Sequence, residues 1–301
     1  MSAASHPSPD LRQAHTAAGL ICWREAGQGP ALVLLHGIGS GADAWAAQFA
    51  AFSASHRVVA WDAPGYGSSQ PLDAAAPLGR DYAAALTALL QHLAIDELVL
   101  VGHSLGALIA AAWAANPTAA PFHLRGLVLA SPARGYGLAP AATRAAKYQE
   151  RLQAIQRLGP DGLAAQRSAA LCAPGAAPEA LERVRRNMAR VTPGGYAQAA
   201  HLLAHDDLLT HLRAVRVQMR VPVAVLCGSA DRITLPADCA ALASAVGAPF
   251  SPIADAGHAC YVDAPQAFNA ALAQALSTLS TALPAALPAT FPAATGAKHH
   301  G

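Results

Sequence analysis

Three residues that together can cleave an ester follow one another along the chain: a serine, an aspartate and a histidine. Ser104 lies between glycines in the segment Gly102-His103-Ser104-Leu105-Gly106. A serine hydroxyl is a weak nucleophile at neutral pH, so it needs a histidine as general base and a carboxylate that orients this histidine. Asp231 and His258 are the candidates, because each stands on a loop that follows an apolar run. The predicted chemistry is therefore acyl transfer.

The segment around Ser104 stands where an apolar strand, residues 98–101, gives way to an apolar helix, residues 104–115. A G-x-S-x-G turn in this setting is a nucleophile elbow, in which the serine adopts a strained backbone conformation and its hydroxyl is exposed. Any side chain at Gly102 or Gly106 would collide with the neighbouring strand or helix in such a turn. The context therefore favours a catalytic serine over a chance match.

The acid and the base are expected at the ends of two neighbouring strands. The strand at 222–227 continues into Gly228-Ser229-Ala230-Asp231, and the strand at 250–253 leads to Asp255-Ala256-Gly257-His258. Asp255 is the alternative acid, but it is too close to His258 in sequence to support the imidazole from its far side. Asp231 is therefore the predicted acid.

Acyl transfer also needs donors for the oxyanion of the tetrahedral intermediate. The predicted pair is the backbone N–H of Leu105, directly after the serine, and that of Ile38, in the glycine-rich loop after the strand at 31–36. The same loop formally fits a dinucleotide fingerprint, with Asp62 where a ribose-binding acid would stand. The histidine before the first glycine, the tight turn after Asp62 and the serine elbow argue against this, so we predict no cofactor and no metal.

Apolar runs alternate with Ala- and Leu-rich stretches, a pattern typical of an α/β fold with a mostly parallel sheet and helices on both faces. Strands are predicted at 20–24, 31–36, 57–61, 98–101, 126–130, 222–227 and 250–253, and helices at 44–53, 80–93, 104–115, 237–246 and 265–279.

The alternation of strand and helix patterns is interrupted once, between about residues 134 and 216, where charges recur at helical spacing and no convincing strand pattern occurs. The predicted division is an N-terminal extension (1–17), a core (18–133 and 217–280), a helical cap (134–216) and a disordered Ala/Pro-rich tail (281–301). A cap would cover the carboxyl ends of the strands, where open α/β sheets hold their active sites. Tyr196, His201 and Tyr261 are therefore predicted to line a substrate pocket. A surface insertion without a role in binding is the alternative.

Composition limits the function further. The chain has 53% hydrophobic residues, 13% charged residues and a net charge of +2, which predicts a small, rather apolar substrate and no nucleic-acid partner. Its five cysteines form no CxxC pair, which is typical of buried free thiols in a reducing cytoplasm. The N-terminus shows no signal peptide, and the apolar stretch at 98–115 is interrupted by glycine, histidine and serine, so we expect a cytoplasmic protein without a membrane segment.

Taken together, these motifs resemble those of the α/β-hydrolase superfamily, from about residue 18 to residue 280. The matching segments are His36–Gly39, Asp62–Ser69, Gly102–Gly106, Gly228–Asp231 and Gly257-His258. Within the superfamily, the segment Val191–Ala197 looks most like the branch of 3-oxoadipate enol-lactonases and small-ester hydrolases. The resemblance implies a cofactor-free reaction in which Ser104 is acylated and water activated by His258 then releases the acid.

The predicted activity is hydrolysis of a carboxylic ester or lactone. A carbon–carbon bond hydrolase acting on a dienol diketone is the enzymatic alternative, since it would use the same serine. A ligand receptor without enzymatic activity on the same scaffold is the alternative from another class. Haloalkane dehalogenases and epoxide hydrolases are disfavoured, because they carry an aspartate where this chain has Ser104. The sequence makes no prediction of the oligomeric state.

Overall fold

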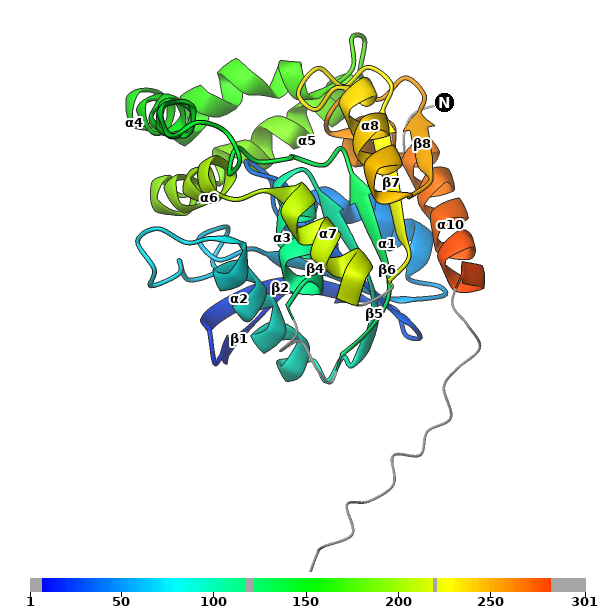
Figure 1. The fold of residues 1–301 in the computed structure, drawn as a ribbon. Helices are drawn as coiled ribbons and strands as arrows, with labels where there is room; N and C mark the ends of the chain where they lie inside the picture. Colours follow the sequence, from blue (N-terminus) through cyan, green and yellow to red (C-terminus); the bar gives the residue numbers. More distant parts are fainter. Residues whose placement is uncertain (1–6, 117–121, 219–220, 283–301) are drawn as a thin grey trace, which may run out of the picture.

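A computed structural model describes residues 7–116, 122–218 and 221–282, in which eight strands form one sheet (Figure 1). The strand order is β1-β2-β4-β3-β5-β6-β7-β8. Among these described strands the pairs β1–β2 and β2–β4 are antiparallel, and the other pairs are parallel. The bounds are β1 Leu11–Thr16, β2 Gly19–Ala26, β3 Ala31–Leu35, β4 Arg57–Asp62, β5 Glu97–His103, β6 His123–Ala130, β7 Val223–Gly228 and β8 Phe250–Ile253. The predicted α/β-hydrolase fold class is confirmed.

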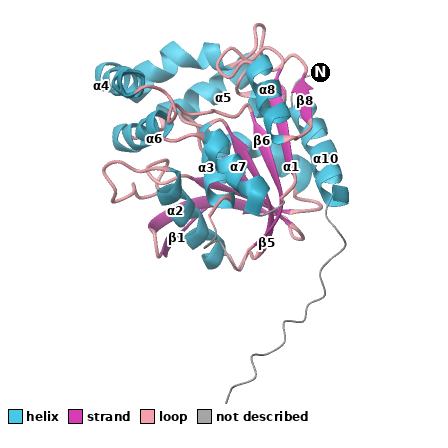
Figure 2. Ribbon diagram, viewed as in Figure 1, coloured by secondary structure: helices cyan, strands magenta, loops and turns pink. Residues whose placement is uncertain are grey.

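Helices cover both faces of this sheet (Figure 2). Along β3, Leu32 and Leu34 face one apolar cluster while Val33 and Leu35 face the other, as the two-residue period of a strand requires. The bounds are η1 Ala42–Trp45, α1 Ala46–Phe52, α2 Gly79–His92, α3 Leu105–Ala114, α4 Ala141–Leu171, α5 Pro178–Ala189, α6 Pro193–His205, α7 Leu208–Gln218, α8 Pro236–Val246, α9 Cys260–Asp263 and α10 Pro265–Ala282.

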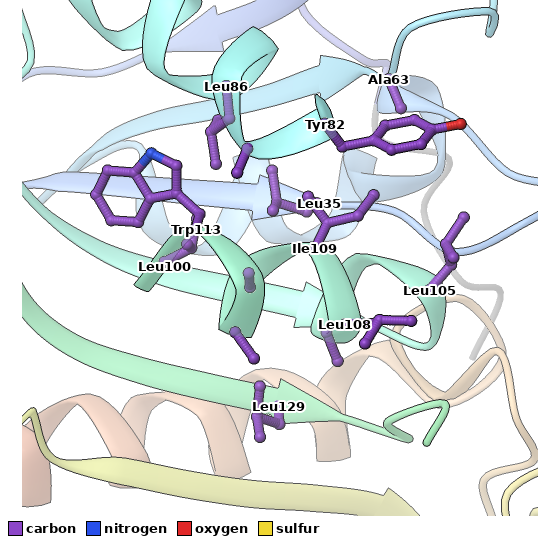
Figure 3. Packing of buried hydrophobic residues seen from close by; sticks show 14 of the residues in the cluster. Leu35, Ala63, Tyr82, Leu86, Leu100, Leu105, Leu108, Ile109, Trp113 and Leu129 are labelled. Atoms are coloured by element: carbon purple, nitrogen blue, oxygen red, sulfur yellow. The ribbon is translucent and has the colours of Figure 1, made fainter. Parts of the chain in front are cut away.

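Helix α3, which follows Ser104, is buried along its whole length. Its residues Leu108 and Ile109 pack among side chains of α2 and of the central strands (Figure 3). The helix also approaches the sheet closely, because a Cβ at Gly106 would lie 2.2 Å from the carbonyl oxygen of Leu35. Dense packing around α3 therefore fixes the position of the residue at its start.

The seven expected strands are all in the sheet, and β1 is an additional strand that the sequence analysis did not predict. It lies at residues 11–16, within the range assigned to an N-terminal extension. Strand β1 is an edge strand that pairs only with β2 among the described strands, and most of its side chains are exposed. A mostly exposed edge strand has no apolar alternation for sequence analysis to find.

Between β6 and β7 the described residues form four helices and no strand of the sheet. Helices α4, α5 and α6 pack together beyond the carboxyl ends of β5 and β6, whereas α7 packs against α3 (Figure 1). Helix α4 is kinked at Gly159, whose φ is +64° and which precedes Pro160. The division into core and cap stays a prediction, and the predicted tail lies outside the described residues from position 283 onward.

All five cysteines are buried and free, as predicted. None of the helices in the described ranges has both the length and the apolar character needed to cross a bilayer.

Candidate active site

Ser104 lies at the sharp turn between β5 and α3. Its φ of +52° and ψ of −113° are strained for a residue with a side chain, at a typical cost of about 1–3 kcal/mol. Two hydrogen bonds hold the turn: the Ser104 N–H donates to the carbonyl of Ala130 at 3.0 Å, and the Ser104 carbonyl accepts from the N–H of Ala133 at 3.2 Å. The fixed turn sets Ser104 in the wall of a cavity of about 450 Å³.

Asp231 and His258 form a buried pair at the ends of β7 and β8. The Oδ2 atom of Asp231 accepts a hydrogen bond from Nδ1 of His258 at 2.9 Å. Because Nδ1 donates to this carboxylate, Nε2 is left as the acceptor, which is the tautomer that a general base needs. Burial raises the pKa of Asp231, but hydrogen bonds from His258 and Thr234 and the charge of His258 outweigh it and hold this pKa below its usual range.

Thr234 is a part of this site that the sequence analysis missed. Its hydroxyl donates to Oδ2 of Asp231 at 2.7 Å and lies 3.3 Å from Nδ1 of His258. The N–H of Ile233 and that of Thr234 donate to Oδ1 of Asp231 at 2.8 and 2.9 Å. The signal in the sequence is the threonine three positions after the aspartate, a pattern typical of a local turn around a carboxylate.

Asp255, the alternative acid, is exposed, and the described residues show no contact between its carboxylate and the imidazole of His258. The backbone N–H of Asp255 donates to the hydroxyl of Ser229. The geometry therefore pairs His258 with Asp231.

Ser104 and His258 line the same cavity. Within the described parts of the chain, the Ser104 hydroxyl makes no hydrogen bond, so it is not bonded to His258. The hydrogen bond between His258 and Asp231, in contrast, is formed. Catalytic hydrogen bonds are often long in free enzymes and tighten when the substrate binds.

The two predicted oxyanion donors are free. The N–H groups of Ile38 and Leu105 make no hydrogen bond to any described residue. The loop that carries Ile38 lies directly against the elbow, because a Cβ at Gly37 would come within 3.0 Å of the Cβ of Ser104. Two unpartnered N–H groups beside a strained serine are the arrangement that stabilises an oxyanion.

The glycine-rich loop is held by His36 and Asp62. Nε2 of His36 accepts from the N–H of Ala63 at 3.0 Å, and Oδ1 of Asp62 accepts from the N–H of Ala42 at 2.8 Å. A Cβ at Gly67 would lie 2.5 Å from Oδ2 of Asp62, so the turn packs tightly on this carboxylate. Asp62 is buried and engaged in the loop, which disfavours the role of a ribose-binding acid.

His103, inside the elbow, contacts the backbone of His258. Its Nε2–H donates to the carbonyl oxygen of His258 at 2.7 Å, and its ring lies 4.7 Å from that of Tyr261. Burial, with the nearby charge of His258, lowers the pKa of His103 to about 3, so its imidazole is neutral at pH 7. The sequence analysis assigned no role to this contact.

Two of the three predicted pocket residues reach the cavity. Tyr196 and Tyr261 line it. His201 does not: its Nδ1 is hydrogen-bonded to the carbonyl of Pro77 at 3.1 Å, and its ring stacks on that of His205 at 4.1 Å. Arg134, Arg151 and Arg167 line the cavity as well, and the sequence analysis named none of them individually. Within the described ranges, no group of three or more His, Cys, Asp or Glu side chains could hold a metal ion.

Comparisons with known proteins identify the family to which this fold belongs. The alpha/beta hydrolase family matches residues 32–271. The 3-oxoadipate enol-lactonase 2 of Acinetobacter baylyi is 29% identical over 249 residues, which cover 81% of this chain and 87% of that enzyme. The 2-succinyl-6-hydroxy-2,4-cyclohexadiene-1-carboxylate synthase of Klebsiella pneumoniae is 31% identical over 259 residues, 83% of this chain and 94% of that enzyme.

Among solved structures, a thermophilic esterase from Thermogutta terrifontis, determined with malate bound, has a TM-score of 0.78 at 26% identity, covering 90% of this chain and 99% of the esterase. An enol-lactonase from Burkholderia xenovorans has the same fold, with a TM-score of 0.75 at 22% identity, covering 88% of this chain and all of that one. The family match covers strands β4 to β8, nearly all of β3 and every motif segment from the glycine-rich loop to His258, and the chain therefore belongs to the alpha/beta hydrolase family.

Proposed function

We propose that the protein is a serine hydrolase that cleaves a carboxylic ester or lactone of a small substrate through an acyl-enzyme. The observation that carries this proposal is the pair of Asp231 and His258, joined at 2.9 Å, at the cavity that Ser104 also lines. The free N–H groups of Ile38 and Leu105 supply the second requirement of acyl transfer, an oxyanion site.

The proposed reaction has two halves. Nε2 of His258 takes the proton of the Ser104 hydroxyl as Oγ attacks the carbonyl carbon, and the Asp231 carboxylate stabilises the imidazolium that forms. The carbonyl oxygen becomes an oxyanion between the N–H groups of Ile38 and Leu105. The carbon–oxygen bond of the leaving group then breaks, and His258 returns the proton to the departing alcohol. In the second half, His258 takes a proton from a water molecule as this water attacks the acyl carbon. The bond between that carbon and Oγ of Ser104 then breaks, His258 returns the proton to Oγ, and the acid is released.

The cavity wall supports a substrate that has an apolar body and one acidic end. Most of the wall contributed by α4–α6 and the neighbouring loops is apolar, but it also includes three arginines, Arg134, Arg151 and Arg167. Two aspartates, Asp207 and Asp238, also line it. The carboxylate of Asp207 already accepts two hydrogen bonds from Thr210. The names of the relatives agree with an acidic end, since oxoadipate, succinyl carboxylate and malate all carry carboxylates.

The test is a substrate panel of p-nitrophenyl esters, lactones and dienol diketones, measured on one preparation of the wild type and on Ser104→Ala. We expect turnover of esters and lactones that is lost in the variant. Preferred cleavage of a dienol diketone would favour the carbon–carbon bond hydrolase instead. Binding of these compounds without turnover of any of them would favour the ligand receptor.

A further inference from the structure

A second cavity of about 440 Å³ lies beside the catalytic one. Residues of α1, α5, α9 and α10 form most of its wall. Ala44, Tyr261 and Val262 line both cavities, so these three residues form the partition between them. Tyr261 has the largest side chain of the three and is 1% exposed.

The ring of Tyr261 is held across this partition by contacts on several sides. It stacks on the ring of Trp45, with centroids 4.0 Å apart, and lies 4.7 Å from the ring of His103. Its hydroxyl is hydrogen-bonded to Oγ of Ser40 at 2.9 Å, in the loop that also carries Ile38. The side chain that closes the second cavity is thus joined to the oxyanion loop and to the elbow.

The wall of the second cavity suits an alkyl chain. Small apolar side chains form most of it: Ala44, Ala46, Ala47, Ala50, Ala51, Ala177, Ala180, Val262 and Pro265. Glu179, Arg183, Asp263, Gln266 and Asn269 also line it, and two of these polar side chains are hydrogen-bonded to the backbone. Asp263 accepts hydrogen bonds from the N–H groups of Ala173 and Gly257, and Asn269 donates to the carbonyl of Ala47.

We propose that the second cavity is an extension of the substrate site and that Tyr261 closes it, which limits the length of the alkyl chain that the enzyme accepts. The proposal rests on the proposed function, because it assigns the partition to the site of Ser104. A chain that follows the wall past Ala44 and Val262 meets the ring of Tyr261. Removal of that ring joins the two cavities.

The test compares Tyr261→Ala with the wild type on p-nitrophenyl esters from acetate to decanoate. Tyr261→Phe is the matched control, because it removes the hydrogen bond to Ser40 but keeps the ring. Octanoate has four methylenes more than butyrate. If two or three of them enter the extension, the ratio of kcat/KM for octanoate over butyrate should rise about tenfold to a hundredfold in Tyr261→Ala. Tyr261→Phe should keep the wild-type ratio. Tyr261→Leu, a smaller loss of buried volume, covers the case in which the alanine variant does not fold.

A second substitution shows where the longer chain goes. Ala47 lines the second cavity but not the first, so Ala47→Leu in the Tyr261→Ala background fills the extension without touching Ser104. The gain on octanoate should then be lost, while turnover of acetate serves as the reference. A series of alkyl acetates, run in parallel, tells whether the acyl chain or the alcohol enters the extension. An unchanged length ratio in both Tyr261→Ala and Tyr261→Leu, or a gain that survives Ala47→Leu, would overturn the proposal.

A binding measurement separates this proposal from the proposed function. Calorimetry with octanoate on Ser104→Ala and on the double variant with Tyr261→Ala needs no turnover. Tighter binding to the double variant, by about tenfold or more, is expected even if the wild type hydrolyses no ester of the panel. Equal binding to both would contradict the partition, whereas a wild type without ester turnover would contradict the proposed function alone.

Discussion

The two sides of the catalytic cavity differ in how their polar side chains are held. On the side of the sheet, His103 and His258 are buried and hydrogen-bonded to other parts of the chain, and Asp231 is the buried partner of His258. On the opposite side, the guanidinium groups of Arg134 and Arg167 make no hydrogen bond or ion pair with any described residue. Arg151 donates to the carbonyl of Lys147 and lies over the ring of Tyr136.

Under the proposed function, this difference assigns the reaction to the sheet side and the choice of substrate to the opposite side. Groups that stabilise a transition state act best when they are fixed before the substrate arrives, because no reorganisation is then needed during the reaction. Groups that recognise a substrate need donors that are not already used within the protein, and under the proposed function Arg134 and Arg167 have such donors. We therefore expect substitutions on the sheet side to change the rate for every substrate and substitutions on the arginine side to change the ranking of substrates.

The largest effect is expected for Ser104→Ala, which deletes the attacking atom and leaves the scaffold in place. Ester hydrolysis should fall by roughly 10⁴–10⁶ in kcat for every ester of the panel. Circular dichroism and the thermal unfolding midpoint should stay close to those of the wild type. More than a tenth of the wild-type activity in the variant would show that the sheet side does not supply the nucleophile.

Asp231→Asn should lower kcat by about 10⁴, since the amide cannot hold Nδ1 of His258 as a donor. Asp255→Asn is the matched control on the neighbouring loop and should change kcat little, because the side chain of Asp255 is exposed and does not contact His258. Steady-state kinetics of both variants check this. The reverse order of the two effects would move the acid to Asp255.

On the opposite side, Arg151→Met and Arg167→Met should change selectivity. The matched substrates are p-nitrophenyl hemisuccinate and p-nitrophenyl butyrate, which differ in one carboxylate. A hydrogen bond to a charged group contributes about 1.5–3 kcal/mol, so the preference for hemisuccinate should fall by roughly tenfold to a hundredfold, with butyrate hydrolysis retained. Arg185→Met, on the exposed face of α5, is the control. Equal losses on both esters would assign these arginines to the catalytic machinery.

His103 should make folding stability depend on pH. Burial and the charge of His258 lower its pKa from 6.5 to about 3 in the folded protein, so between these values the unfolded chain binds more protons. Stability is therefore lost as pH falls through this window, by about 2 kcal/mol between pH 6.5 and pH 5. Urea unfolding at pH 7 and pH 5 should show a smaller loss in His103→Gln than in the wild type. A loss of the same size in both would contradict this origin.

No change at all is expected on removal of divalent ions. Every step of the proposed reaction is assigned to a protein group: the attack to Ser104, the proton transfers to His258 and the stabilisation of the imidazolium to Asp231. Activity after exhaustive dialysis against a chelator should equal that before dialysis. Restoration of lost activity by a divalent ion would contradict the assignment.

The sheet side could be predicted from sequence because its signals are local. A strand that ends in a serine between glycines, and two strands that end in an aspartate and a histidine, place their side chains at one edge of a parallel sheet. Strand β1 was not predicted, because it is a mostly exposed edge strand. The contact of Thr234 with Asp231 was not predicted, because it depends on the local turn around Asp231.

The opposite side could not be predicted in the same way, because it depends on which face of each helix meets the cavity. Tyr196 and His201 are five positions apart on α6, about 140° around the helix, so only one of them lines the cavity. Arg151 and Arg167 lie on the two sides of the kink at Gly159, where helical periodicity is interrupted. Helical spacing alone therefore does not reveal that both reach the same space.

The most direct test of the central claim is labelling with a p-nitrophenyl dialkyl phosphate, which transfers its phosphoryl group to an activated serine. Peptide mass spectrometry locates the modified residue, and residual ester hydrolysis is measured on the same sample. We predict one phosphoryl group for each protein molecule, on Ser104, with loss of activity in proportion to labelling and no labelling of Asp231→Asn on the same time scale. Stoichiometric labelling of another residue, or full activity with Ser104 modified, would contradict the account.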